Sequence, residues 1–169
     1  MLVRTSNQGT VAAHTEHETH EGKVMMSETP DRVREVMKAV NSLHVLATVD
    51  AEGCPRMRWM GALLEDPERP WTFYLACGVG SRKLQELAQN PNAQLLFSHM
   101  DQWQVASLSG TAEAVDSPEL RQLLWDAVPA MQRYYSGVDD PKLGIIRFTT
   151  RCMELLAMHE AREPYCFEL

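Results

Sequence analysis

The feature that most constrains the fold of this chain is a series of short β-type segments joined by very short links. We expect strands at 44–49, 55–64, 71–76, 93–99, 103–114 and 144–156. Only the turn at 50–53 separates the first two, which predicts a β-hairpin. Parallel strands need a crossover connection of about a dozen residues or more, so these links do not make βαβ units. We therefore expect a mainly β protein, a six-stranded antiparallel closed or split barrel with peripheral helices.

Two helices are predicted from the same start signature, a capping residue followed by proline. Thr29 and Pro30 open the first, and its apolar positions 33, 36, 37 and 40 fall on one helical face. Ser117 and Pro118 open the second, which we expect to reach about Tyr134.

The ends of the chain differ from its centre. Residues 1–24 are polar and show no apolar periodicity, which predicts a disordered leader. Residues 25–158 form the predicted barrel domain, and residues 159–169 a polar C-terminal tail. His14, His17 and His20 recur at a spacing of three rather than the i,i+4 spacing of a helical metal pair. We expect no metal site there.

Charge, hydropathy and cysteine use exclude several classes of protein. A net charge of −7 argues against non-specific binding of nucleic acid. No apolar run approaches the ~20 residues that span a bilayer, and Arg4 is not followed by the apolar core of a secretory signal. The cysteines have no CxxC spacing and predict reduced thiols in a cytoplasmic protein; they are Cys54, Cys77, Cys152 and Cys166.

The segment 78–84 predicts an anion site at the start of a third helix, over 81–89. Ser81 is placed as the N-cap, and Gly78 and Gly80 let a backbone come close. Arg82 and Lys83 occupy the first turn, where the helix dipole already favours anions. A bound phosphate would gather the free N–H groups, the hydroxyl and both cations. The alternative is an exposed helix start with solvated basic residues.

A second pair of cations lies on the predicted strand 55–64. Because side chains alternate, Arg56 and Arg58 share one face, while Met57 and Trp59 share the other. Two guanidinium groups about 7 Å apart repel each other unless an anion or carboxylates lie between them. These arginines either share a phosphate with the helix start or are solvated cations beside acidic neighbours.

The sequence contains no recognisable catalytic motif. It lacks the GxSxG, HExxH and Walker patterns. His44 and His99 lie on or at the end of predicted strands, where histidine is more often packed or at an edge than a base. Cys77 has two interpretations: a thiol whose pKa the nearby cations lower, or a small half-buried residue.

A series of short motifs appears along the chain in a fixed order. They are Gly53-x-Pro55-Arg56, Ser81-Arg82-Lys83, Asn90-Pro91, Leu95-Leu96-Phe97 and Gly110-Thr111-Ala112-Glu113. Together they resemble the pyridoxamine 5'-phosphate oxidase-like flavin-binding split barrels. The length and the terminal helix are most similar to the general stress protein branch, and the likeness covers about residues 28–156.

This resemblance implies a homodimer with two FMN molecules at the subunit interface. The cofactor-binding residues that it implies are Arg56, Met57, Arg58, Trp59, Ala76, Cys77, Ser81, Arg82, Lys83 and Gln104. The first four would line the flavin, and the next five would hold its phosphate and ribityl chain. Gln104 of the partner subunit would contact the ring system.

The chain also departs from the family pattern. Cys77 stands where a threonine is frequent, and Gly61 where the oxidases have a lysine. Residues 153–156 contain no flavin-stacking tryptophan, and the oxidases' Arg-x-His substrate motif is absent. We therefore expect an FMN-dependent oxidoreductase acting on an unidentified small molecule rather than on pyridoxamine phosphate. The alternatives are a non-enzymatic protein that stores or senses flavin, and a structural dimer without flavin.

Overall fold

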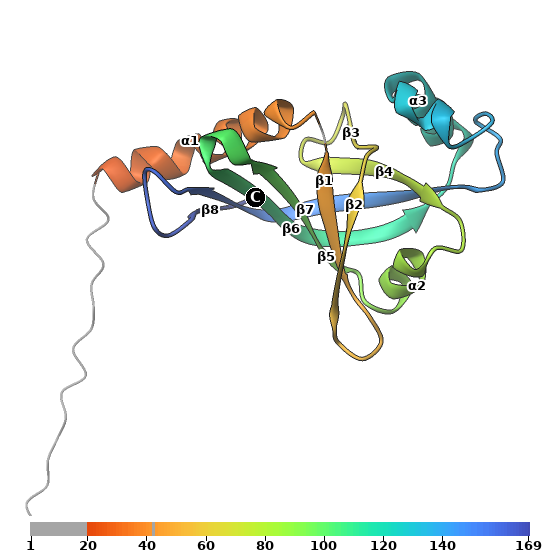
Figure 1. Cartoon of the computed structure of the whole chain (residues 1–169), viewed down its shortest axis with the longest axis horizontal. Coiled ribbons are helices and arrows are strands. Elements are labelled where there is room, and N and C mark those ends of the chain that lie inside the picture. Colours follow the sequence, from red (N-terminus) through yellow and green to blue (C-terminus); the bar gives the residue numbers. More distant parts are fainter. Residues whose placement is uncertain (1–19, 42) are drawn as a thin grey trace, which may run out of the picture.

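The computed structural model describes residues 20–41 and 43–169, with side chains described from residue 28 onward (Figure 1). Most of the predicted leader, residues 1–19, lies outside the described residues. The elements in chain order are α1 (His20–Ala39), β1 (His44–Val49), β2 (Pro55–Met60), β3 (Leu64–Glu65), β4 (Thr72–Gly78), α2 (Arg82–Gln89), β5 (Asn92–His99), the 3-10 helix η1 (Met100–Gln102), β6 (Gln104–Val115), α3 (Pro118–Ala127), the 3-10 helix η2 (Pro129–Arg133), β7 (Leu143–Ala157) and β8 (Tyr165–Glu168).

The strands form one antiparallel sheet that does not close on itself. Their order is β2-β1-β5-β6-β7-β4-β3, and β8 adds to β7. The predicted hairpin of β1 and β2 is confirmed, with His44 opposite Met60 and Val49 opposite Pro55. Because β2 and β3 end the path without pairing, the barrel is split between them. The predicted mainly β split barrel is thus confirmed, with six main strands and the short β3 and β8.

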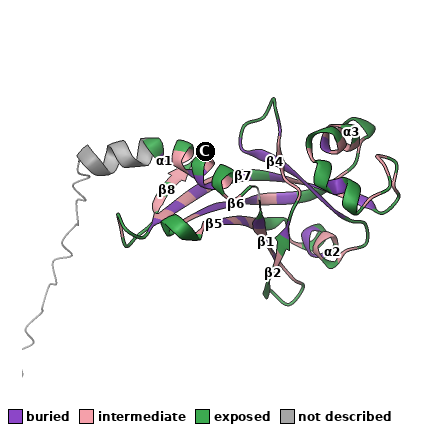
Figure 2. Ribbon diagram, turned by 45° about the horizontal axis from the view of Figure 1, so that its top comes forward, coloured by how far each residue is buried: buried purple, intermediate pink, exposed green. Residues whose placement is uncertain are grey.

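Helices α1 and α2 cover one face of this sheet. Val33 and Val36 of α1 and Leu87 of α2 pack with the apolar residues of that face (Figure 2). The fully buried strand residues in this core are Leu46, Leu75, Leu95, Phe97, Ala106, Leu108, Ile146, Phe148, Met153 and Leu155. Burial of this apolar area is the main contribution to stability.

The opposite face of β2, β1, β5, β6 and β7 has no helix over it in the described chain. Strand register places Trp59 beside Val45, Val45 beside Leu96, and Leu96 beside Ser107. We call the following ten residues the open face: Val45, Ala47, Met57, Trp59, Gln94, Leu96, Val105, Ser107, Glu154 and Leu156. Trp59 is 68% exposed, and its apolar neighbours Val45 and Leu96 are half-buried.

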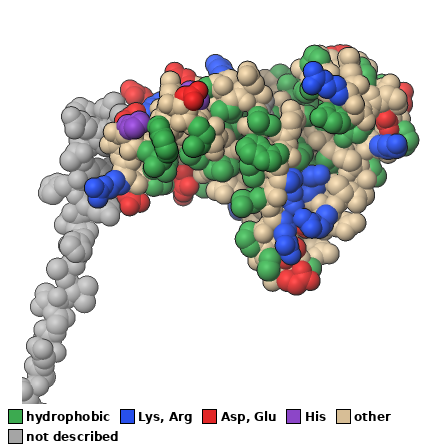
Figure 3. Space-filling view, in the orientation of Figure 1, with side chains coloured by type: hydrophobic (Ala, Val, Ile, Leu, Met, Phe, Trp, Pro, Cys, Tyr) green, Lys and Arg blue, Asp and Glu red, His purple; other side chains and the backbone are tan. Residues whose placement is uncertain are grey.

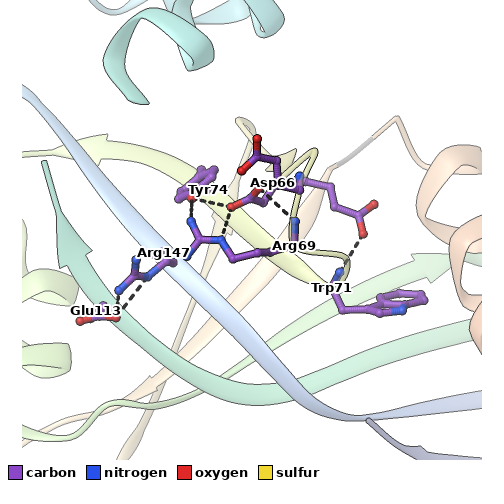
Figure 4. A network of polar contacts seen from close by, with 8 residues as sticks. Asp66, Arg69, Trp71, Tyr74, Glu113 and Arg147 are labelled. Atoms are coloured by element: carbon purple, nitrogen blue, oxygen red, sulfur yellow. Dashed lines mark hydrogen bonds and ion pairs between the residues drawn. The ribbon is translucent and has the colours of Figure 1, made fainter. Parts of the chain in front are cut away.

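Helix α3 and η2 pack over the far end of β4 and β7 and build a second apolar cluster. Leu124 and Met131 bury Tyr74 of β4 there. The Tyr74 hydroxyl donates to Asp66 at 2.7 Å and accepts from Arg69 at 2.6 Å (Figure 4). The Trp71 amide donates to Glu65 at 2.8 Å. These bonds fix the loop that links β3 and β4.

A β-bulge interrupts the long pair of β6 and β7. Ser109 lies opposite Cys152, but Gly110 lies opposite Thr150, so Arg151 is an extra residue in β7. A Cβ at Gly110 would lie 2.0 Å from the Thr149 carbonyl oxygen, a distance that no side chain tolerates. The strand pair therefore requires glycine at position 110, opposite the bulge.

Four predicted boundaries are wrong. The strand expected at 55–64 ends at Met60 as β2, and Leu64–Glu65 form the separate strand β3, because the two segments pair with different neighbours, β1 and β4. Helix α1 begins at His20 instead of Thr29, so Pro30 lies inside it. The preceding residues include Lys, Met and Glu, which are strong helix formers and extend the helix ahead of Pro30. Helix α3 stops at Ala127 because Pro129 follows, and η2 takes its place. The predicted polar tail contains β8, which pairs with β7.

Candidate functional site

The start of α2 lies directly behind the end of β4, across a turn that requires glycine. Gly80 has a φ of +75°, a conformation that residues with a Cβ rarely adopt. The Ser81 amide closes the turn by donating to the Gly78 carbonyl at 3.2 Å. Ser81 is the N-cap residue of α2, as the sequence predicts.

The first turn of α2 lacks the partners that complete most helix starts. The Ser81 side chain makes no capping hydrogen bond, and its hydroxyl oxygen is buried without a hydrogen bond of normal geometry. The first turn contains no acidic residue but includes Arg82 and Lys83. The Leu84 amide donates to the Ser81 carbonyl at 3.0 Å, but the amides of Arg82 and Lys83 have no intrahelical acceptor, and the helix dipole adds positive potential. Hydrogen-bond donors and positive charge are therefore concentrated at this point.

Arg58 of β2 reaches the same helix from the neighbouring hairpin. Its guanidinium donates to the Thr48 hydroxyl at 2.5 Å, to the Leu46 carbonyl at 3.3 Å and to Glu86 of α2 at 2.6 Å. Glu86 is only 4% exposed, and Arg82 lies 3.0 Å from its second carboxylate oxygen. One buried carboxylate of α2 thus holds two arginines from different elements.

Arg56 lies on the same face of β2, nearer to the hairpin turn. Its Nε donates to Asp50 at 2.6 Å. A polar cavity of about 240 Å³ opens between this turn and α2. Its charged lining residues are Asp50, Glu52, Arg56, Arg82 and Glu86. The β1–β2 hairpin extends downward in Figure 1. In the same orientation, Figure 3 shows basic side chains gathered just above the acidic tip of this part of the molecule.

We call Arg56, Arg58, Ser81, Arg82 and Lys83 the basic corner. The sequence predicts that the two arginines of β2 lie on one face, and the structure confirms it. It also places carboxylates beside three of these cations, Asp50 beside one and Glu86 beside two. Lys83 has no ion-pair partner within residues 28–169. That the basic corner binds phosphate stays a prediction.

Cys77, at the end of β4, is buried behind the basic corner. Burial raises the pKa of its thiol, and the opposing effects of Lys83 and the nearby Ser81 hydroxyl are smaller. The hypothesis of a thiol with a lowered pKa is therefore wrong, and Cys77 is a small buried residue. All four cysteines are free of disulfide bonds in the structure.

A second cavity, of about 320 Å³, lies where the barrel is split. We call it the split cavity. It brings together Trp59 of β2 and Ala76 of β4, two of the predicted cofactor residues. The residues that complete it are Met60, Gly61, Ala62, Ala130, Met131, Arg133, Tyr134 and Tyr135. Met57, two residues before Trp59, lies on the same side of β2 and is 71% exposed.

Gln104 is not brought near these residues within one chain. It is the first residue of β6, paired with His99 and Ala157. The other end of β6 lies beside α2, where the Ala112 amide donates to the Pro91 carbonyl at 2.8 Å. A contact of Gln104 with the same ligand requires a second subunit.

The remaining candidates are structural. His44 is fully buried, with its ring centroid 5.5 Å from that of Phe97, which confirms the prediction of a packed histidine. No group of three or more metal-ligating side chains occurs among the described residues. The described helices include none long and apolar enough to cross a membrane.

Sequence reasoning missed Glu86, although part of its signal was visible. Arg82 and Glu86 are four residues apart, a spacing at which side chains meet on a helix. The contact with Arg58 depends on how the hairpin packs against α2, which the sequence pattern does not specify.

The fold and the cavity at its opening define a split β-barrel protein. The family model described as pyridoxamine 5'-phosphate oxidase matches residues 29–156. Since this is most of the chain, the protein belongs to the pyridoxamine 5'-phosphate oxidase family.

Individual relatives resemble the chain in different ways. A pyridoxine/pyridoxamine 5'-phosphate oxidase of Yersinia enterocolitica is 43% identical over 76 residues, which are 44% of this chain and 33% of that enzyme. The match thus spans a third of the enzyme's length. A protein of Clostridium acetobutylicum related to general stress protein 26 has a TM-score of 0.71 at 20% identity, covering 85% of this chain and 96% of its own.

The same fold is shared with a protein of another described role. A heme-binding protein of Mycobacterium smegmatis has a TM-score of 0.63 at 19% identity, covering 80% of this chain and 56% of its own. At such identities the likeness shows the fold alone, and function has to be argued from the site.

Proposed function

We propose that this chain binds FMN, with the phosphate in the basic corner and the ring system at the split cavity, and acts as a flavin-dependent oxidoreductase on a small molecule. The relatives named as pyridoxine phosphate oxidase and general stress protein support a role of this type. The missing Arg-x-His motif argues against pyridoxamine phosphate as the substrate.

The observation that carries the proposal is the incomplete start of α2. A buried serine hydroxyl without a hydrogen bond of normal geometry, the amides of Arg82 and Lys83 and the two adjacent cations all suit a phosphate. Ser81 would donate its hydroxyl, Lys83 would supply a point charge, and Arg82 would use the amino groups that Glu86 leaves free. Arg56 and Arg58 would add positive potential.

The split cavity suits the ring system. Its volume of about 320 Å³ lies within the range of small-molecule sites, which is about 300–1,000 Å³. Trp59 and Tyr135 offer aromatic surface, and Ala76 leaves room beside β4. When bound, FMN would supply electron or hydride transfer. The residues of this chain would orient the ring and limit its contact with water.

The open face supports the proposed homodimer. Its apolar members are half-buried or exposed, including Trp59 at 68%, and no described element covers them. Exposed contiguous apolar surface with a tryptophan is typical of protein interfaces. A partner on this face would cover it and could bring its own Gln104 to the flavin. We expect sedimentation to show a dimer, and Trp59→Asp to shift it toward monomer.

A non-enzymatic role is the second candidate. The lining of the split cavity contains no histidine, cysteine or carboxylate that could transfer a proton at neutral pH. Storage or sensing of flavin would need none. Consumption of NADPH or NADH by the FMN-loaded protein, with a range of electron acceptors, separates an oxidoreductase from a flavin carrier.

The proposal is tested by titrating the purified chain with FMN and with riboflavin while following flavin fluorescence and visible absorbance. The double variant Arg82→Ala/Lys83→Ala should weaken FMN binding at least about a hundredfold, because charge-assisted hydrogen bonds contribute roughly 1.5–3 kcal/mol each. Riboflavin lacks the phosphate, so its affinity should hardly change.

The control is Lys38→Ala, which removes a cation from the last turn of α1, far from α2. It should leave both affinities unchanged. Equal losses for FMN and riboflavin in the double variant would show that the basic corner does not contact phosphate. A chain that binds neither flavin would refute the proposed function.

A further inference from the structure

Glu86 places a negative charge in the middle of a predicted anion site. It is 4% exposed and accepts hydrogen bonds from the Thr48 hydroxyl at 2.5 Å and from Arg58 at 2.6 Å. The Nε of Arg82 lies 3.0 Å from its other oxygen. A carboxylate that is buried, accepts hydrogen bonds from two side chains and forms an ion pair with a third is a built part of the corner rather than a chance surface contact.

The carboxyl group is ionised at neutral pH. Burial alone raises its pKa, but the hydrogen bonds from Thr48 and Arg58 and the charges of Arg58 and Arg82 outweigh this effect, so the pKa lies below its ordinary value. Glu86 therefore acts on the basic corner as a permanent negative charge.

The two arginines are shared between this carboxylate and any incoming anion. Arg58 already donates to Thr48, Leu46 and Glu86, and its side chain is only 18% exposed. Arg82 is 70% exposed and uses its Nε toward Glu86, so its amino groups face outward. A phosphate can engage both arginines fully only by drawing them away from the carboxylate.

We propose that Glu86 is an internal anion that competes with the FMN phosphate for Arg58 and Arg82 and so limits the preference of this protein for FMN over riboflavin. This inference rests on the proposed function. Glu86 would be a specificity-determining residue that acts through the arginines and does not itself touch the flavin.

The charge balance of the corner supports this role. Four cations face three carboxylates, Asp50, Glu52 and Glu86, which leaves one net positive charge for a phosphate dianion. Removing the charge of Glu86 leaves two and also removes a like charge beside the phosphate, which favours the dianion. If Glu86 served only to position Arg82, removing it would have the opposite effect on FMN.

The test compares dissociation constants for FMN and riboflavin in the wild type and in Glu86→Gln. Glutamine has nearly the same shape, and its oxygen can still accept from Thr48 and Arg58. We expect the dissociation constant of FMN to fall about tenfold and that of riboflavin to stay unchanged. The ratio of the riboflavin constant to the FMN constant should therefore rise about tenfold.

The matched control is Glu65→Gln, which neutralises a carboxylate paired with Arg34 between α1 and β3. It should leave the ratio unchanged. A ratio that stays constant or falls in Glu86→Gln, while the wild type binds FMN, overturns the inference and leaves the proposed function intact. If the wild type binds neither flavin, the proposed function fails and the inference fails with it.

A second measurement does not depend on the folding of the variant. In ¹⁵N-labelled wild-type protein, the Nε–H resonance of Arg82 reports its contact with Glu86. It should shift when FMN is added and stay in place with riboflavin. The same position with both ligands would overturn the inference.

Discussion

Helices α2 and α3 both have a serine at the N-cap position, but the two serines make different contacts. In α3, the Ser117 hydroxyl accepts from the Leu120 amide at 3.1 Å, Pro118 follows, and Glu119 lies in the first turn. In α2, the Ser81 hydroxyl makes no such bond, and the first turn contains Arg82 and Lys83.

The difference separates a structural helix start from a start available to a ligand. The first turn of α3 satisfies its own amides and places negative charge at the positive end of the dipole, which stabilises the helix. The first turn of α2 leaves the Ser81 hydroxyl and the amides of Arg82 and Lys83 without such partners and adds positive charge, which destabilises the isolated helix. An arrangement that is unfavourable by itself becomes favourable when an anion binds.

The largest effect is expected from reversing one charge in each first turn. Lys83→Glu should weaken FMN binding by at least about a hundredfold, because an attractive contact becomes a repulsive one. The same change should raise the free energy of unfolding by about 0.3–1 kcal/mol, since the dipole favours an acid there. Flavin titration and thermal unfolding measure the two quantities.

The matched change in α3 is Glu119→Lys. It should lower the melting temperature and leave FMN affinity unchanged, so the two variants move stability in opposite directions. If Lys83→Glu lowers stability as Glu119→Lys does, the two helix starts do not differ in the way described.

An intermediate effect is expected from removing each serine hydroxyl. Ser117→Ala should destabilise the protein by about 1 kcal/mol, the usual cost of a lost N-cap. That loss corresponds to a fall in melting temperature of about 2–4 °C. Ser81→Ala should change stability by less than about 0.5 kcal/mol, because no capping bond is lost.

The same pair distinguishes the two sites by binding. Ser81→Ala should weaken FMN binding about tenfold and riboflavin binding little, since a hydrogen bond to phosphate is charge-assisted. Ser117→Ala should leave both constants unchanged. Equal destabilisation by the two alanine variants would contradict the comparison.

The smallest effect is expected in the acid dependence of stability. The Glu119 backbone amide, followed by the Ser117 hydroxyl, lowers the pKa of the Glu119 carboxyl below its ordinary value of 4.5. Because the folded-state pKa is lowered, the stability that this carboxylate contributes is present above 4.5 and is lost as the pH falls through and below that value.

The measurement is the difference in melting temperature between the wild type and Glu119→Gln. It should be positive at pH 7 and should approach zero as the pH falls below about 4.5, where the wild-type carboxyl becomes protonated. A difference that grows on acidification would show that Glu119 does not stabilise α3 through its charge.

Local chemistry in the sequence was sufficient to predict both helix starts. The caps at Ser81 and Ser117 and the conformation of Gly80 each depend on a few adjacent residues. The sheet also followed from alternation and short links. Strand β8 was missed because its pairing with β7 determines it. The true start of α1 was missed because the cap and proline at residues 29 and 30 were given more weight than the helix formers before them. The alternation of Tyr165 and Phe167 with exposed residues was the one visible signal of β8.

The candidate site was predictable only in part, for a related reason. Strand alternation correctly placed Arg56 and Arg58 on one face. It could not reveal that Glu86 approaches Arg58, since these residues are 28 positions apart and meet through tertiary packing. The direction of the pKa shift of Cys77 was likewise set by burial, which depends on the assembled core rather than on neighbouring charges.

The extra residue Arg151 in β7 affects where insertions and deletions can be tolerated in this chain. On one side of it, Phe148 and Thr150 of β7 are buried; on the other, Met153 and Leu155 are. The inward positions thus change from even to odd numbers across the bulge. Deleting this single residue would restore a regular alternation and leave Met153 and Leu155 facing inward. A deletion at another position of β7 would reverse the faces of the residues on one side of it. Changes of length within β7 should therefore be tolerated at the bulge and excluded from the rest of the strand.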